Sequence, residues 1–161
     1  MRILLILCTI CLLSQSCRRP GNQLSEAQKQ EIIKSATEVV KKVFDYSNNM
    51  DFETGLNHYS EASNSYFITD GIIHSLADLR KSYKDIGPVV EELHNTIESW
   101  NVKVLSPDIV TFTLPVKLRL KLKGIHEFSG ELIWTAILQK QEDQWLVVQS
   151  HESWLNCAEV A

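Results

Sequence analysis

Apolar residues recur at helical spacing in the first third of the chain. Ser25 and Gln28 form a capping-box sequence, and apolar side chains then fall three and four positions apart as far as Phe44. Lysine and glutamate residues occupy the positions between them. The pattern predicts one long amphipathic helix that ends near residues 47–49.

Three shorter elements are expected next. Asp51 can cap a helix over residues 51–59, whose apolar side chains share one face. Two short apolar runs within residues 65–74, separated by an Asp-Gly pair, predict a β-hairpin. Residues 75–86 again show helical spacing and are followed by Gly-Pro, which stops a helix.

From Val89 onwards the period changes from helical to alternating. One strand is expected over residues 91–105, and a second over residues 110–122, where apolar and polar side chains alternate. After a loop over residues 124–130, residues 131–140 are apolar on both faces, which favours a central strand. Residues 145–154 form the last strand. Helices followed by three or four long antiparallel strands make an α+β fold.

Length and composition agree with a single globular domain. The chain has 161 residues, of which 44% are hydrophobic and 22% are charged. Its formal net charge is −4, and no block of like charge is long enough to suggest a nucleic-acid partner.

The N-terminal residues 1–16 have the pattern of a signal peptide. Arg2 supplies a positive start and residues 3–13 are apolar. This stretch is too short to span a bilayer, which needs about 20 apolar residues. We therefore expect the protein to be exported.

The sequence LLSQSC that ends at Cys17 resembles the lipobox of bacterial lipoproteins, in which the cysteine carries lipid and becomes the mature N-terminus. Ser16 fits this motif, whereas Ser14 stands where a leucine is usual. The resemblance implies a membrane-anchored lipoprotein of the cell envelope, with residues 17–23 as a tether and residues 24–161 as the domain. A soluble periplasmic or secreted protein is the alternative.

The four cysteines divide between these segments. Cys8 and Cys11 lie in the apolar stretch and leave with the signal peptide. If Cys17 carries lipid, Cys157 is a free thiol in a loose tail. If Cys17 is not lipidated, a Cys17–Cys157 disulfide that ties the termini together is the alternative.

The element order and the closing strand resemble the nuclear-transport-factor-two-like superfamily, and within it the SnoaL-like domains. The resemblance covers residues 24–155 and rests on FITDG at 67–71 and on the Trp-aliphatic-aliphatic pattern that leads from Trp145 to His151 and Ser153. It implies a cone in which a curved, mostly antiparallel sheet wraps around the long first helix and leaves a pocket. In such domains the histidine at this position tends to face the pocket.

The last strand supplies the main candidate for chemistry. Strict alternation places His151 towards the pocket and Glu152 on the other face. His151 is the candidate base or hydrogen-bond donor, and a half-buried structural histidine is the alternative. The expected pocket side chains are Tyr59, Tyr66, Trp100, Trp134, Gln149, His151 and Ser153.

An enzyme that isomerises or cyclises a carbonyl compound needs a carboxylate in an apolar pocket. The alternation places none there. Asp70 belongs to a turn, Asp51 to a helix cap and Asp78 to the exposed side of a helix. We therefore expect a small-ligand-binding domain rather than a catalyst, with a SnoaL-like enzyme that uses His151 and an envelope protein-interaction module as alternatives.

Cofactors and partners follow from the remaining residues. The histidines lack the paired spacing of a metal site, so neither a metal nor another cofactor is expected. We expect a small apolar molecule as the ligand. The basic stripe of the second long strand, namely Lys117, Arg119, Lys121 and Lys123, predicts a solvated sheet face and leaves open whether the chain forms a homodimer there.

Overall fold

The computed structural model describes residues 24–124 and 127–159 of the chain. The predicted signal peptide at residues 1–16, the tether at residues 17–23 and Cys17 lie outside these residues. No helix in the described part is long and apolar enough to cross a membrane.

The helices begin and end close to where the spacing predicted. They are α2 (Glu26–Asn48), α3 (Phe52–Leu56), α4 (Leu76–Ile86) and the short 3₁₀ helix η1 (Gly87–Val89). The capping box at the start of α2 is confirmed, because the Ser25 side chain accepts from the Gln28 amide and the Gln28 side chain accepts from the Ser25 amide. The Ser75 side chain likewise accepts from the Asp78 amide at the start of α4.

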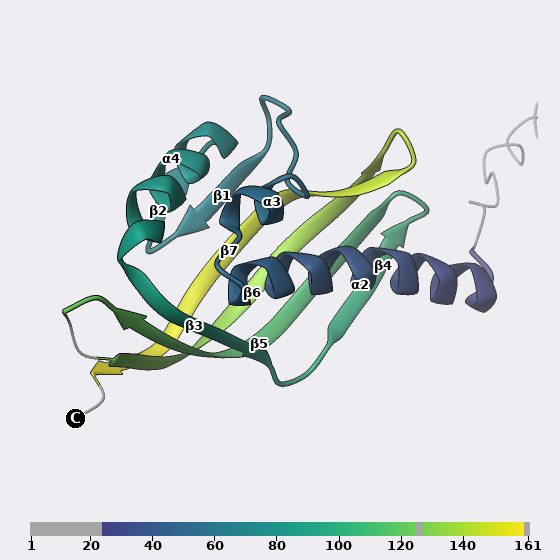
Figure 1. The fold of residues 1–161 in the computed structure, drawn as a ribbon. Coiled ribbons are helices and arrows are strands. Elements are labelled where there is room, and N and C mark those ends of the chain that lie inside the picture. The colour runs from purple at the N-terminus through teal and green to yellow at the C-terminus, as the bar shows by residue number, and fades with distance from the viewer. Residues whose placement is uncertain (1–23, 125–126, 160–161) are drawn as a thin grey trace, which may run out of the picture.

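Seven strands form one curved, mostly antiparallel sheet, so the predicted α+β fold is confirmed (Figure 1). The strands are β1 (Tyr66–Thr69), β2 (Ile72–His74), β3 (Val90–Ile97), β4 (Asn101–Ser106), β5 (Ile109–Leu122), β6 (Glu127–Gln141) and β7 (Gln144–Glu159). Their order is β2-β1-β7-β6-β5-β3, and β4 also pairs with β5. Only the β1–β7 pair is parallel among the strand pairs of the described residues. β6 lies inside the sheet, as its two apolar faces predicted.

Three predicted boundaries were wrong. The strand expected over residues 91–105 is interrupted at residues 98–100, so β3 and β4 are separate strands that pair with different halves of β5. The loop expected over residues 124–130 is shorter, because β6 already begins at Glu127. The loose tail expected around Cys157 continues β7, whose backbone pairs with Gly130 at that point.

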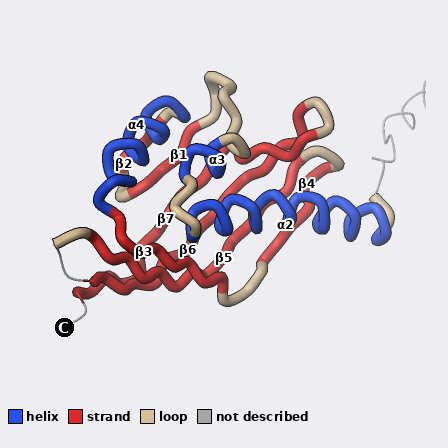
Figure 2. Tube along the Cα trace, viewed as in Figure 1, coloured by secondary structure: helices blue, strands red, loops and turns tan. Residues whose placement is uncertain are grey.

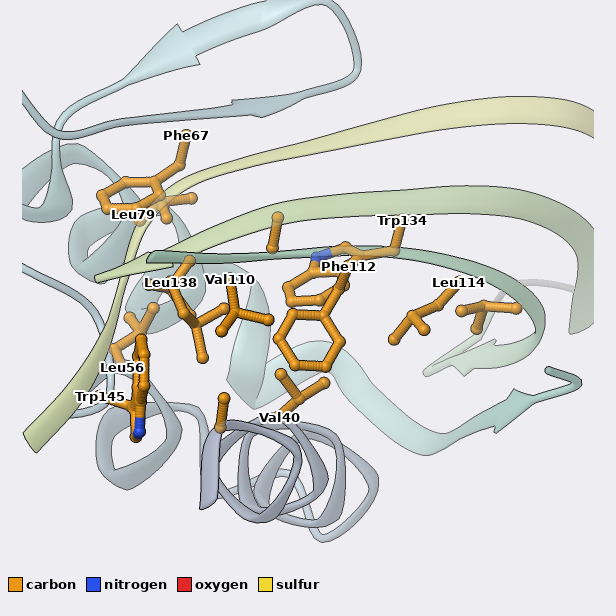
Figure 3. Close-up of a cluster of buried hydrophobic side chains, with 14 of the residues drawn as sticks. Val40, Leu56, Phe67, Leu79, Val110, Phe112, Leu114, Trp134, Leu138 and Trp145 are labelled. Carbon is orange, nitrogen blue, oxygen red and sulfur yellow. The ribbon is translucent and has the colours of Figure 1, made fainter. Parts of the chain in front are cut away.

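The core lies between the sheet and α2. Figure 2 shows α2 crossing one face of the sheet, with α3 and α4 towards its β1 end. In Figure 3 the side chains of Phe112 and Trp134 reach from the sheet towards Val40 of α2. These three residues are almost fully buried, with relative exposures of 1%, 4% and 0%. The helix and the concave sheet face therefore share one core, and burial of its apolar surface stabilises the fold.

The strand β7 carries a bulge. Ile137 of β6 pairs with Gln149, whereas its neighbour Leu138 pairs with Val147, so Val148 has no partner of its own. An extra residue in one strand shifts the side chains that follow it to the opposite face, here as far as the next register shift at Leu155. Before the bulge the odd-numbered residues Trp145 and Val147 point into the core. After the bulge the even-numbered residues point inwards instead.

The basic stripe lies on the outer sheet face and is largely neutralised. Lys117 pairs with Glu98, Arg119 Nη2 lies 2.6 Å from Glu127, and Lys121 Nζ lies 3.1 Å from Glu91. Lys123 Nζ donates to the carbonyl of Pro88 at 2.7 Å. Carboxylates on β3 and β6 and in the β3–β4 connection therefore reduce the repulsion that four cations would bring to this face. A homodimer through this face stays a prediction.

Candidate functional site

A cavity opens between the concave face of the sheet and the helices α2, α3 and α4. Its volume is about 80 Å³. One buried water needs about 10–15 Å³, so the cavity has room for several waters or a small ligand. Its lining residues are Val43, Phe44, Ser47, Phe52, Gly55, Leu56, Tyr59, Tyr83, Asn95, Val116, Leu118, Leu132, Trp134 and Glu152.

Aromatic rings supply much of the wall. Phe44 meets Trp134 edge-on, with ring centroids 5.3 Å apart. Phe52 of α3 stacks on Tyr83 of α4 at 4.8 Å. Tyr59 closes the wall near β7 and packs edge-on against Phe67 of the core, at 5.0 Å. Because the rings hold one another in place, the cavity is formed before any ligand enters it.

One carboxyl lines this wall, and it belongs to Glu152 of β7. The prediction that Glu152 lies on the face opposite the pocket was wrong. The bulge at Val148 inverts the alternation, so Ser150 and Glu152 point inwards and pair across the sheet with Ala136 and Trp134. The same shift places His151 on the outer face, where it pairs with Thr135.

The Glu152 carboxyl is held in an unusual electrostatic environment. Burial in the cavity raises its pKa from the ordinary 4.5 to about 7, and the neighbouring charge of Asp70 adds to the increase. Desolvation disfavours the charged form of a carboxyl, and a second negative charge acts in the same direction. Glu152 therefore changes its protonation state near neutral pH.

Asp70 occupies the turn between β1 and β2, as its Asp-Gly sequence predicted. Its φ of 52° lies in the left-handed region, and Gly71 follows at 77°. Trp154 Nε1 donates to Asp70 Oδ1 at 3.1 Å, which fixes the carboxylate beside the last strand. A methyl group at Gly130 would lie 2.8 Å from Trp154 Cζ3 and 2.7 Å from the Asn156 carbonyl oxygen. Glycine at position 130 thus leaves the space that the indole ring occupies.

Two phenols also line the cavity. Burial raises the pKa of Tyr59 above its usual value, and electrostatic interactions with Tyr83 and Glu152 act in the same direction, while a hydrogen bond with Ser150 opposes them. Burial also raises the pKa of Tyr83, with Glu152 and Asp70 adding to the effect. Both hydroxyls therefore stay protonated and can donate a hydrogen bond to a ligand.

The structure brings together only some of the side chains that the sequence predicted for the pocket. Tyr59 and Trp134 line the cavity. The other predicted residues lie outside its lining: Tyr66, Trp100, Gln149, His151 and Ser153. Gln149, His151 and Ser153 follow the bulge, which turns them to the outer face together with Tyr66, the partner of Gln149 on β1. Trp100 stands between β3 and β4 and meets Phe112 edge-on. Ligand contacts of these residues stay predictions.

Glu152 was not predicted from the sequence to face the pocket, and neither Tyr83, Phe44 nor Phe52 was predicted as a pocket residue. Tyr83 and Phe44 both lie within segments whose helical spacing was recognised, so these two residues could have been included. The available signal for Glu152 was the alternative frame of the last strand, in which Ser150, Glu152 and Trp154 share a face. Within residues 24–124 and 127–159, no group of three or more metal-ligating side chains comes together.

No family model matches the chain, and no curated protein matches it in sequence. Solved structures do match it in fold. A putative scytalone dehydratase from Novosphingobium aromaticivorans superposes with a TM-score of 0.77 at 7% identity, covering 85% of this chain and 93% of that one. The hexachlorocyclohexane dehydrochlorinase LinA-type3 from Novosphingobium barchaimii gives 0.74 at 9% identity, covering 85% and 95%.

A nuclear transport factor 2-like superfamily protein from Salmonella enterica serovar Typhimurium gives a TM-score of 0.70 at 10% identity. It covers 78% of this chain and 92% of that one. At sequence identities this low, the superpositions show that the fold is shared and nothing further. The chain has the NTF2-like, SnoaL-like fold: an α+β cone in which a curved sheet wraps around the first long helix.

Proposed function

We propose that the protein binds a small, mostly apolar molecule in this cavity, and that Glu152 is the group that exchanges a proton with it. One observation carries the proposal. Among the described lining residues of a preformed aromatic cavity, Glu152 alone carries a carboxyl, and its pKa of about 7 lets it give or take a proton near neutral pH.

The first test is native mass spectrometry of the protein purified from its own host. We expect one additional mass that is lost on denaturation. Leu118→Phe adds bulk to the cavity lining and should abolish this mass. Ile133→Phe adds a ring to a β6 position whose neighbours Leu132 and Trp134 face inwards, and it should retain the mass.

Two outcomes would contradict the proposal. An additional mass that survives Leu118→Phe would place the ligand outside the cavity. Protein from the native host that carries no additional mass, in the wild type as well as in both variants, would show that the cavity holds no ligand there.

A proton-transfer enzyme is the second candidate, and the neutral phenols beside Glu152 favour it. In such a reaction the Glu152 carboxylate removes a proton from a carbon next to a carbonyl group. A hydroxyl of Tyr59 or Tyr83 donates to the enolate oxygen that forms, and Glu152 then returns the proton to the product. Two structures with this fold are named as a dehydrochlorinase and a putative dehydratase, names that describe eliminations.

Hydrogen exchange distinguishes binding from this chemistry. The molecule released from the protein is incubated in D₂O with the wild type or with Glu152→Gln. A catalyst exchanges carbon-bound hydrogen for deuterium in the wild type and loses this activity by about 10²–10⁴-fold in the variant. Equal exchange in both proteins would reject Glu152 as the base.

We also propose that the protein is exported and anchored to a membrane through lipid on Cys17. The support is the signal-like pattern of residues 1–16 and the lipobox-like sequence that ends at Cys17. Labelled palmitate should enter the wild type and not Cys17→Ser. A wild-type protein that takes up no label, and that fractionates as a soluble protein, would favour the periplasmic or secreted alternative.

A further inference from the structure

The charge of the cavity restricts what it can bind. The described lining residues include no lysine, arginine or histidine, so nothing in this lining offers a positive charge to an anionic ligand. The charges that face the site are negative: Glu152 on the wall and Asp70 in the neighbouring turn. A ligand carboxylate or phosphate would meet like charge in a poorly hydrated space, which is strongly unfavourable.

No counter-charge accompanies Glu152 in the part of the chain that the structure describes. Within the described residues, the only neighbouring charge that acts on its carboxyl is the like charge of Asp70, and no hydrogen bond to it is observed. An ionised carboxylate in such a place is costly unless a cation or hydrogen-bond donors accompany it. A ligand in the cavity can supply the cation or the hydrogen-bond donor that the Glu152 carboxylate requires.

The aromatic wall suits a cation with apolar substituents. Rings of tryptophan, tyrosine and phenylalanine attract a cation over their faces, and the attraction grows where water is excluded. The lining offers Trp134, Tyr59, Tyr83, Phe44 and Phe52 around the carboxyl of Glu152. The stacked pair of Phe52 and Tyr83 and the edge-on pair of Phe44 and Trp134 hold these rings in place.

We propose that the ligand of this cavity is a small organic amine, bound as its ammonium ion with an N–H donated to Glu152 and its apolar part against the aromatic rings. The inference rests on the proposed function and adds the chemical class of the ligand.

A neutral ligand that accepts a hydrogen bond favours the protonated form of Glu152, whereas an ammonium ion favours the carboxylate. A carbonyl compound that accepts a hydrogen bond would bind best to the protonated carboxyl, so its affinity would fall as pH rises. An ammonium ion binds best to the carboxylate, so its affinity should rise with pH and level off above the pKa of about 7. The other titratable groups that face this carboxyl are Asp70, which is exposed, and the phenols Tyr59 and Tyr83, whose raised pKa values keep them neutral throughout.

The test compares three probes of nearly the same shape on the purified full-length protein. They are benzylamine, benzyl alcohol and benzoate, measured by titration calorimetry between about pH 5 and about pH 8. At the upper pH we expect benzylamine to bind at least about tenfold more tightly than benzyl alcohol, since the amine alone makes a charge-assisted hydrogen bond. Benzoate should not bind. Below the pKa of Glu152, the affinity for benzylamine should fall by up to about tenfold per pH unit.

Glu152→Gln supplies the matched variant, because it keeps the shape of the side chain and removes its charge. At the upper pH this variant should bind benzylamine at least about tenfold more weakly than the wild type does. Its affinity for benzyl alcohol should stay within about twofold of the wild-type value. Glu31→Gln, on the exposed side of α2, is the control and should change neither affinity.

Benzyl alcohol that binds as tightly as benzylamine would overturn the amine class and leave the proposed cavity function standing, as would an affinity for benzylamine that rises at low pH. Binding of benzoate would overturn the charge argument. If none of the probes binds, the amine class is rejected, and the cavity function is then judged by native mass spectrometry, which uses no probe.

Discussion

The desolvated carboxyl of Glu152 makes the stability of this protein depend on pH in a way that one substitution removes. Its pKa rises from 4.5 to about 7 on folding. Between these values the folded state binds more protons than the unfolded state, so the free energy of unfolding falls as pH rises through this window. Above about pH 7 both states are ionised and the loss is complete. Glu152→Gln cannot ionise and lacks this dependence.

The size of the effect follows from the two pKa values. Each tenfold change in a protonation constant is worth about 1.4 kcal/mol, so a change from 4.5 to about 7 corresponds to at most about 3 kcal/mol. Glu152 is half-buried rather than sealed, and solvent that reaches its carboxyl reduces this value. A typical domain is stable by about 5–15 kcal/mol, so the effect is a large share of the total.

Urea unfolding of the wild type and Glu152→Gln at a series of pH values measures this effect. Carboxyls distant from Glu152 contribute equally in both proteins, so their contributions cancel in the difference. Relative to the wild type, the variant should gain about 2–3 kcal/mol of stability between about pH 4 and about pH 8. Glu31→Gln removes an exposed carboxyl from α2, and its free energy of unfolding should depend on pH as that of the wild type does.

The free energy of unfolding of Glu152→Gln could instead follow that of the wild type across the pH range, within about 0.5 kcal/mol. This result would refute the claim that ionisation of Glu152 destabilises the folded protein. It would show that the carboxyl remains hydrated in the folded protein. A difference that shrinks as pH rises would refute it as well, because it would mean that the ionised carboxylate is stabilised by a partner.

Three further predictions concern the surroundings of this carboxyl. Asp70→Asn keeps an oxygen for the Trp154 indole and removes a charge, so the pKa of Glu152 should fall in a carboxyl NMR titration; an unchanged value would exclude Asp70 as a cause. Gly130→Ala places a methyl carbon 2.8 Å from Trp154 Cζ3 and should cost about 1–3 kcal/mol in urea unfolding, and a neutral result would mean that the ring moves freely. His151→Ala should change stability by less than about 1 kcal/mol and leave the titration of Glu152 unaltered, because His151 lies on the outer face; a shifted titration would place it at the cavity.

Local patterns in the sequence were sufficient for the elements at the start of the fold. Capping residues and helical spacing placed α2 and α4 within a residue or two. The Asp-Gly pair placed the hairpin of β1 and β2, and alternation placed β5. These signals work because the helix period, the caps and tight turns depend on residues only a few positions apart. The α+β class followed from their order.

The pocket depended on interactions that act across the fold. Strict alternation made His151 the inward residue, and a bulge of one residue at Val148 reversed that assignment and turned Glu152 inwards. Whether a strand bulges depends on the strands that pair with it on both sides, here β6 and β1. The sequence of β7 alone does not specify these partners. The raised pKa of Glu152 likewise results from burial and from Asp70, more than 80 positions earlier in the chain. The sequence by itself determined the helices, the hairpin and the fold class, because these depend on near neighbours. Only the tertiary structure decided which side of the last strand faces the cavity, because that choice depends on pairing between distant segments.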